Sequence, residues 1–125
     1  MIVLAPISVG ELIDKITILK IKSNLIKDAD KIFNIEKELQ SLEELKNELN
    51  LDLDTIDLLQ NQLYKVNMEL WHIENYKREC EKNQSFDDKF IKSARQVYLK
   101  NDLRASLKKQ INELVGSTII EEKSY

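Results

Sequence analysis

The chain has few of the residues that make turns and cross-links. Its 125 residues include two glycines, one proline and one cysteine. A sheet protein needs many glycine- and proline-containing turns, so this scarcity favours helices. The lone Cys80 cannot form an internal disulfide, which fits a reducing compartment, and we therefore expect a cytoplasmic protein.

Further absences exclude whole classes of protein. No apolar run approaches the length of a membrane span, and the first residues lack a signal-peptide pattern, so we expect no membrane insertion. A net charge of -3 lacks the basic excess of nucleic-acid-binding proteins. The single histidine, His72, has no partners at metal-ligand spacing, and no nucleotide or cofactor motif is complete. We predict neither a metal site nor a cofactor.

What is present is apolar residues at steps of three and four, in a chain of which 42% is hydrophobic. This spacing predicts one all-α domain over residues 1–125, with helices at about 9–27, 30–49, 54–82 and 86–115. We expect the second and third helices to form a long antiparallel hairpin, packed by the first and last. Doubled apolar stripes on the first and third helices predict a homodimer. Residues 2–4 and 117–120 are β-prone and predict a short two-stranded ribbon.

Three polar residues interrupt the apolar seam of residues 90–115: Asn101, Arg104 and Lys108. One interpretation is a helix kinked or broken near residues 101–102, with Asp102 capping a new helix, because Asn and Asp compete well for backbone groups. The other is an anion pocket, since guanidinium groups suit phosphate and carboxylate. The sequence favours the break.

A second polar pair, Asp14 and Thr17, lies near an apolar stripe of the first helix. Asp14 either pairs with a lysine or arginine at a packing boundary, which we favour, or serves as a general base. If the chain ends converge, several polar residues share one face, which is then a candidate binding site. Its members are Asp14, Lys15, Arg95, Asn101, Asp102, Arg104, Lys108 and Glu122.

Four stretches of the chain carry a resemblance: residues 8–19, 70–74, 94–98 together with 101–105, and 121–125. Their sequences include Gly-Glu-Leu-Ile-Asp-Lys in the first and Glu-Glu-Lys-Ser-Tyr in the last. Together they resemble a family of small bacterial proteins of unknown function. The resemblance implies no assigned activity; it does imply genes that lie near those of glycosyltransferases and surface-polysaccharide synthesis.

Two functions follow from these patterns. We favour an interaction or scaffold protein without catalytic activity, a cytoplasmic dimer that is accessory to glycosyltransferase or cell-envelope polysaccharide machinery. The alternative is a small protein or enzyme that binds an anion or sugar phosphate. That alternative uses a polar cluster of Asp14, Lys15, Arg95, Asn101 and Arg104.

Overall fold

A computed structural model describes residues 1–116 and 121–124, and it contains four helices. They are α1 (Val9–Leu25), α2 (Ala29–Glu48), α3 (Leu53–Asn83) and α4 (Asp88–Val115). The predicted all-α fold is confirmed, and every helix end lies within a few residues of its predicted position. Ser8 caps α1 by accepting a hydrogen bond from the backbone N–H of Glu11, as its capping box predicts.

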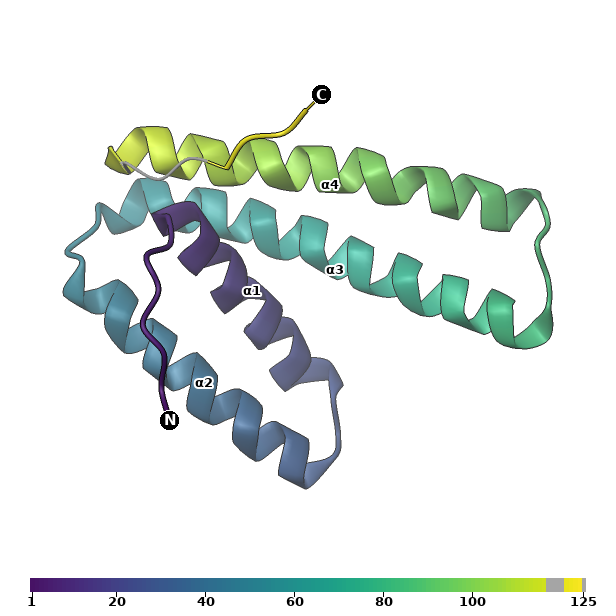
Figure 1. Ribbon diagram of the computed structural model, residues 1–125, viewed down its shortest axis with the longest axis horizontal. Coiled ribbons are helices and arrows are strands. Elements are labelled where there is room, and N and C mark those ends of the chain that lie inside the picture. The colour runs from purple at the N-terminus through teal and green to yellow at the C-terminus, as the bar shows by residue number, and fades with distance from the viewer. Residues whose placement is uncertain (117–120, 125) are drawn as a thin grey trace.

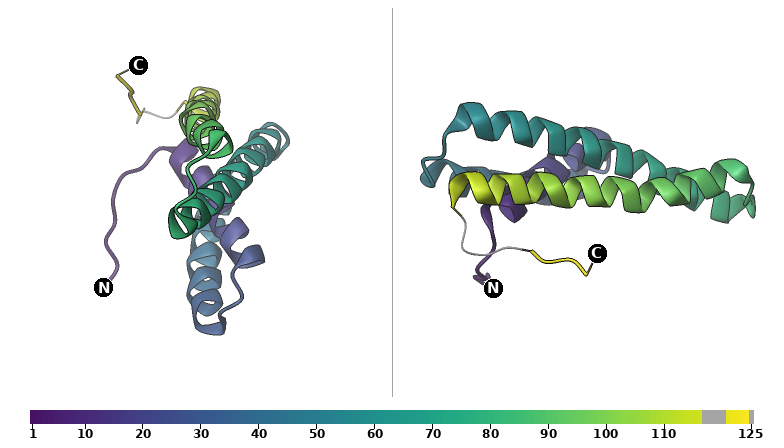
Figure 2. Two further views of the ribbon diagram at one scale, coloured as in Figure 1. Left: turned by 90° about the vertical axis from the view of Figure 1, so that its right-hand side faces the viewer. Right: turned by 90° about the horizontal axis from the view of Figure 1, so that it is seen from above.

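The helices pair differently from the predicted hairpin of residues 30–49 with 54–82. Helices α1 and α2 form one hairpin, and α3 and α4 form a second, longer one that runs obliquely to the first (Figure 1). Helix α1 packs against all three others, whereas no Cα atom of α2 comes within 8 Å of α3. Figure 2 shows α2 as the outer helix. Most residues of α1 between Leu12 and Ile21 are buried, so the other helices cover this helix on more than one side.

The core lies where α1 meets the second hairpin. Ile13 and Ile16 of α1 are fully buried against Ile56 and Leu63 of α3 and Ile111 of α4. Each such side chain stabilises the fold by about 1.5–3 kcal/mol relative to an exposed one. The C-terminal half of α3 and the N-terminal half of α4 extend beyond α1 (Figure 1).

Helix α4 runs unbroken through residues 101–102, so the predicted break there is wrong, and Figure 1 shows the helix without a sharp kink. Asp102 lies within the helix and does not cap it; its carboxylate lies 3.4 Å from the Lys123 ammonium. The apolar pattern shifts around α4 because the helix has different neighbours along its length. The N-terminal half of α4 packs on α3 alone, and its C-terminal half packs on both α1 and α3.

The predicted terminal ribbon falls partly on residues 117–120, which lie outside the described residues. Its other half, residues 2–4, belongs to no strand and is exposed. Among the described residues, no helix is long and apolar enough to span a membrane.

Candidate functional site

The site is built around a close crossing of α1 over α4. A Cβ atom at Gly10 would lie 2.5 Å from the Lys108 carbonyl oxygen, so only glycine lets the two backbones approach this closely. The Gly10 N–H donates to Oδ1 of Asn112 at 2.7 Å. This crossing places the first turns of α1 beside the polar residues of α4.

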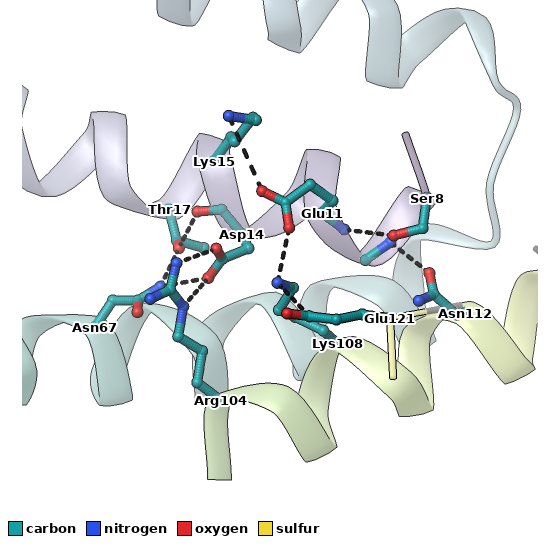
Figure 3. A network of polar contacts seen from close by, with 11 residues as sticks. Ser8, Glu11, Asp14, Lys15, Thr17, Asn67, Arg104, Lys108, Asn112 and Glu121 are labelled. Carbon is teal, nitrogen blue, oxygen red and sulfur yellow. Dashed lines mark hydrogen bonds and ion pairs between the residues drawn. The ribbon is translucent and has the colours of Figure 1, made fainter. Parts of the chain in front are cut away.

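Asp14 is fully buried one turn after the crossing, and its carboxylate is shared by two other helices (Figure 3). Arg104 of α4 donates from Nε at 2.9 Å and from Nη2 at 2.5 Å. Asn67 of α3 donates to the same carboxylate at 2.9 Å and to the Thr17 hydroxyl at 2.8 Å. Its hydrogen bonds with Asp14 raise the pKa of Arg104, so the guanidinium stays charged. The pairing of Asp14 with a cation that the sequence favours is thus observed.

Lys108 lies between two carboxylates, Glu11 at 2.7 Å and Glu121 at 2.8 Å. Burial alone lowers the pKa of Lys108, but its hydrogen bonds to both carboxylates outweigh that effect and raise it. The hydrogen bond from Lys108 in turn lowers the pKa of Glu121. The segment that contains Glu121 is thereby fastened to the α1–α4 crossing.

An open cavity of about 500 Å³ lies next to these two networks. We call it the polar cavity. Arg104 borders it, and the Arg104 side chain retains 29% of its accessible surface, although Asp14 is buried behind it. Tyr98, with 54% exposure, forms part of the wall. The complete lining comprises Glu11, Val97, Tyr98, Asn101, Arg104, Ala105, Lys108, Glu121 and Lys123.

The structure brings only some of the candidate residues together. Asn101, Arg104 and Lys108 line the polar cavity. Lys15 is exposed and pairs at 3.9 Å with Glu11, one of the lining residues. Asp102 is placed beside the cavity through its contact with Lys123. The remaining two candidates, Arg95 and Glu122, are exposed and line neither the polar cavity nor the second cavity, which lies between α1 and α3.

Sequence reasoning missed several members of the site. Asn67 carried no signal, because it lies 53 positions from Asp14 and looks like an ordinary polar residue of an amphipathic helix. Glu121 was passed over for its neighbour Glu122. Tyr98 was not among the predicted site residues. Its place in the seam together with Asn101 and Arg104, at steps of three, could have identified it.

The geometry limits what these residues do chemically. Asp14 has no accessible surface and both of its oxygens accept hydrogen bonds, so in this conformation it cannot act as a general base towards a substrate. Arg104, in contrast, uses Nε and Nη2 on Asp14, while its Nη1 group has no partner among the described residues. Within the described ranges, no three His, Cys, Asp or Glu side chains are grouped to hold a metal ion.

The fold and site are those of a four-helix protein with a charged cavity at a helix crossing. The model of the family of unknown function DUF6165 matches residues 3–125, and the chain belongs to that family. Neither a curated protein nor a solved structure matches the chain. Three of the four stretches that carry the resemblance contribute to the polar cavity, through Glu11, through Tyr98 to Arg104, and through Glu121.

Proposed function

We propose that the protein binds a small phosphorylated sugar or similar polyol in the polar cavity. The observation that carries this proposal is a rigidly held Arg104 that borders an open cavity of about 500 Å³. That volume lies within the usual range for small-molecule sites. Asp14 fixes the guanidinium with two hydrogen bonds and leaves its Nη1 group for an anion. Such preorganisation reduces the entropic cost of binding.

The other lining groups suit hydroxyl groups better than a second anion. Lys108 is already neutralised by Glu11 and Glu121, so the cavity has no large positive excess. The two carboxylates accept hydrogen bonds, and the Asn101 amide both donates and accepts. A ligand with one phosphate and several hydroxyl groups satisfies this set, whereas inorganic phosphate brings no sugar hydroxyl groups to the carboxylates and the amide. Tyr98 offers an exposed ring face for the apolar side of a sugar.

The test is calorimetric titration with glucose 1-phosphate, glucose and inorganic phosphate as probes. We expect glucose 1-phosphate to bind more tightly than either part alone. At a hundredfold excess over Kd it stabilises the fold by about 2.7 kcal/mol, which a thermal melt detects. Binding of none of the three probes at millimolar concentration would refute the proposal.

Two pairs of variants locate the site. Asn101→Ala and Tyr98→Ala are expected to weaken glucose 1-phosphate binding by about tenfold each, the loss of one good polar or ring contact. Asn34→Ala, on an exposed position of α2, and Tyr98→Phe, which keeps the ring, are the matched controls. Equal affinities for Asn101→Ala and Asn34→Ala would place the ligand elsewhere.

A second function, self-association, is favoured by the first four residues. Met1, Ile2, Val3 and Leu4 are all apolar, and their exposures range from 78% to 117%. They stand away from the helices in the left view of Figure 2. Contiguous exposed apolar residues mark interaction sites, and two β-prone segments of identical sequence can pair about a two-fold axis. A role beside sugar-transfer or polysaccharide machinery belongs to this hypothesis and rests on the resemblance alone.

Sedimentation tests this second function. If residues 1–4 join two copies, the wild-type chain sediments as a dimer at micromolar concentration and Val3→Asp sediments as a monomer with an unchanged melting temperature. Leu25→Asp, an exposed apolar position at the end of α1, is the control. A wild-type monomer at all concentrations would exclude self-association.

A further inference from the structure

A second open cavity, of about 380 Å³, lies between α1 and α3. We call it the Trp71 cavity. Ile18 and Ile21 of α1 and Leu70 of α3 form an apolar wall, and the half-buried Trp71 completes it. Arg104 borders this cavity as well as the polar one. A tryptophan beside aliphatic groups suits a planar ring, because aromatic rings prefer offset or edge contacts with other rings.

Asn67 presents a hydrogen-bond acceptor to the same cavity. Both hydrogens of its amide nitrogen are used, on Asp14 and Thr17, which fixes the orientation of the amide. Its Oδ1 has no hydrogen bond within the described structure, and no unsatisfied side-chain oxygen there is buried. Since Asn67 lines the cavity, Oδ1 retains access to it. A ligand with an N–H or O–H donor satisfies this oxygen.

Arg78 supplies a cation at the other end. It lines the cavity, is exposed, and has no ion pair or hydrogen bond among the described residues. Asn67, Trp71 and Arg78 follow one another at steps of four and seven, so they share one face of α3. Arg78 lies about 10 Å along the helix axis from Trp71 at 1.5 Å per residue. The order along α3 is acceptor, ring, cation.

We propose that the Trp71 cavity binds a heteroaromatic anion, of which a nucleoside monophosphate is the simplest biological form. The base lies against Trp71, its exocyclic amino group donates to Asn67 Oδ1, and the phosphate pairs with Arg78. This site shares only the bordering Arg104 with the proposed sugar-phosphate site and does not need that site to be occupied. Its apolar wall distinguishes the two, because the polar cavity has charged groups on most sides.

Trp71 is the only tryptophan of the chain, so its fluorescence reports directly on this cavity. Titration with adenosine 5′-monophosphate, excited at the red edge of tryptophan absorption, is expected to give a saturable change. Adenosine lacks the anion and ribose 5-phosphate lacks the ring, and each is expected to bind at least about tenfold more weakly. Calorimetry on the same samples detects binding that leaves the fluorescence unchanged.

Arg78→Gln tests the anion contact, and Arg95→Gln is its control, because both arginines are exposed on helices and Arg95 lines neither cavity. We expect at least a tenfold loss of affinity in the first and no change in the second. Asn101→Ala leaves this binding intact, so failure here is distinguishable from failure of the sugar-phosphate site. Equal effects of the two arginine variants, or affinity no better than that of adenosine, would overturn the proposal.

Discussion

Asp14 is the most constrained polar residue of the protein, because its buried carboxylate joins three helices. Asp14→Asn keeps the volume but leaves Arg104 without its anion. Removing one partner of a buried ion pair costs about 3–5 kcal/mol, and we expect about 3 kcal/mol because water reaches Arg104. Urea denaturation monitored by circular dichroism measures the loss in free energy of unfolding.

The control for this prediction is a double-mutant cycle with Arg104→Gln. The double variant is expected to lose less stability than the sum of the single variants, since neither partner is then left as an unpaired charge. Strictly additive losses would mean that the ion pair contributes nothing and that each side chain acts through other contacts.

At the scale of single residues, the sequence predicted that Asp14 pairs with a cation, but it did not predict which residues contact Asp14. The spacing of α1 placed Asp14 at a packing boundary and suggested a cation beside it. Spacing within one helix does not indicate which residue of another helix lies opposite. Asn67 and Arg104 are 53 and 90 positions from Asp14, and only the tertiary packing brings them there.

At the scale of elements, the continuity of α4 separates two interpretations of Asp102. If Asp102 capped a new helix, the backbone N–H groups of the next three residues would lack helical partners. In a continuous helix these groups bond to carbonyls four residues earlier. We therefore expect the amides of Leu103, Arg104 and Ala105 to exchange slowly in hydrogen-exchange NMR. Exchange of these amides as fast as that of residues 1–7 would show that the helix is broken near Asp102.

The predicted break near residues 101–102 was wrong because the apolar residues of this helix were all assumed to lie on one buried face. Leu107 and Ile111 are buried, but Leu103 and Leu114, which lie at the same steps of three and four along α4, are about half exposed. Exposed leucines are common on helices. Together with the buried residues they form an apolar pattern that shifts around α4, and a break near residues 101–102 is the simplest explanation of such a shift.

Gly10 determines how closely α1 approaches α4. Gly10→Ala forces its Cβ against the Lys108 backbone carbonyl, which cannot rotate away as a side chain does. We expect a loss of about 1–3 kcal/mol in the free energy of unfolding, as for other overpacked sites. The melting temperature falls accordingly.

Gly116→Asn is the matched control for Gly10→Ala. Gly116 has a φ of 67° and ends α4, a position that asparagine tolerates, and no atom lies within 4 Å of the added Cβ. A Gly10→Ala variant as stable as the wild type would show that the crossing adjusts without cost.

For the whole molecule, the sequence predicted the number and lengths of the helices but not which pairs form. Helices α2 and α3 are consecutive and each carries an apolar stripe, and consecutive elements are usually neighbours in space. Asn50, with a φ of 52°, turns the chain between them. The pairing was decided by α1, whose apolar surface is large enough to bury α2 on one side and the α3–α4 hairpin on the other.

The attachment of the segment with Glu121 gives the whole molecule a predictable dependence on pH. The hydrogen bond from Lys108 lowers the pKa of Glu121 below its ordinary value of 4.5. The ionised carboxylate of Glu121 therefore stabilises the folded state relative to the unfolded state. This contribution is complete above pH 4.5 and is lost as the pH falls through the lowered pKa. Lys108, whose pKa is raised, stays charged throughout this range.

Glu121→Gln therefore has an effect that depends on pH. Near neutral pH we expect the variant to be less stable than the wild type by about 0.2–1 kcal/mol, the range for a solvent-exposed pair, since Glu121 is about half exposed. Below pH 4.5 the difference shrinks towards zero, because the wild-type carboxylate becomes protonated. Urea denaturation across this range measures both, with Glu122→Gln as control. A difference that is the same at every pH would mean that Glu121 contributes through packing and not through its charge.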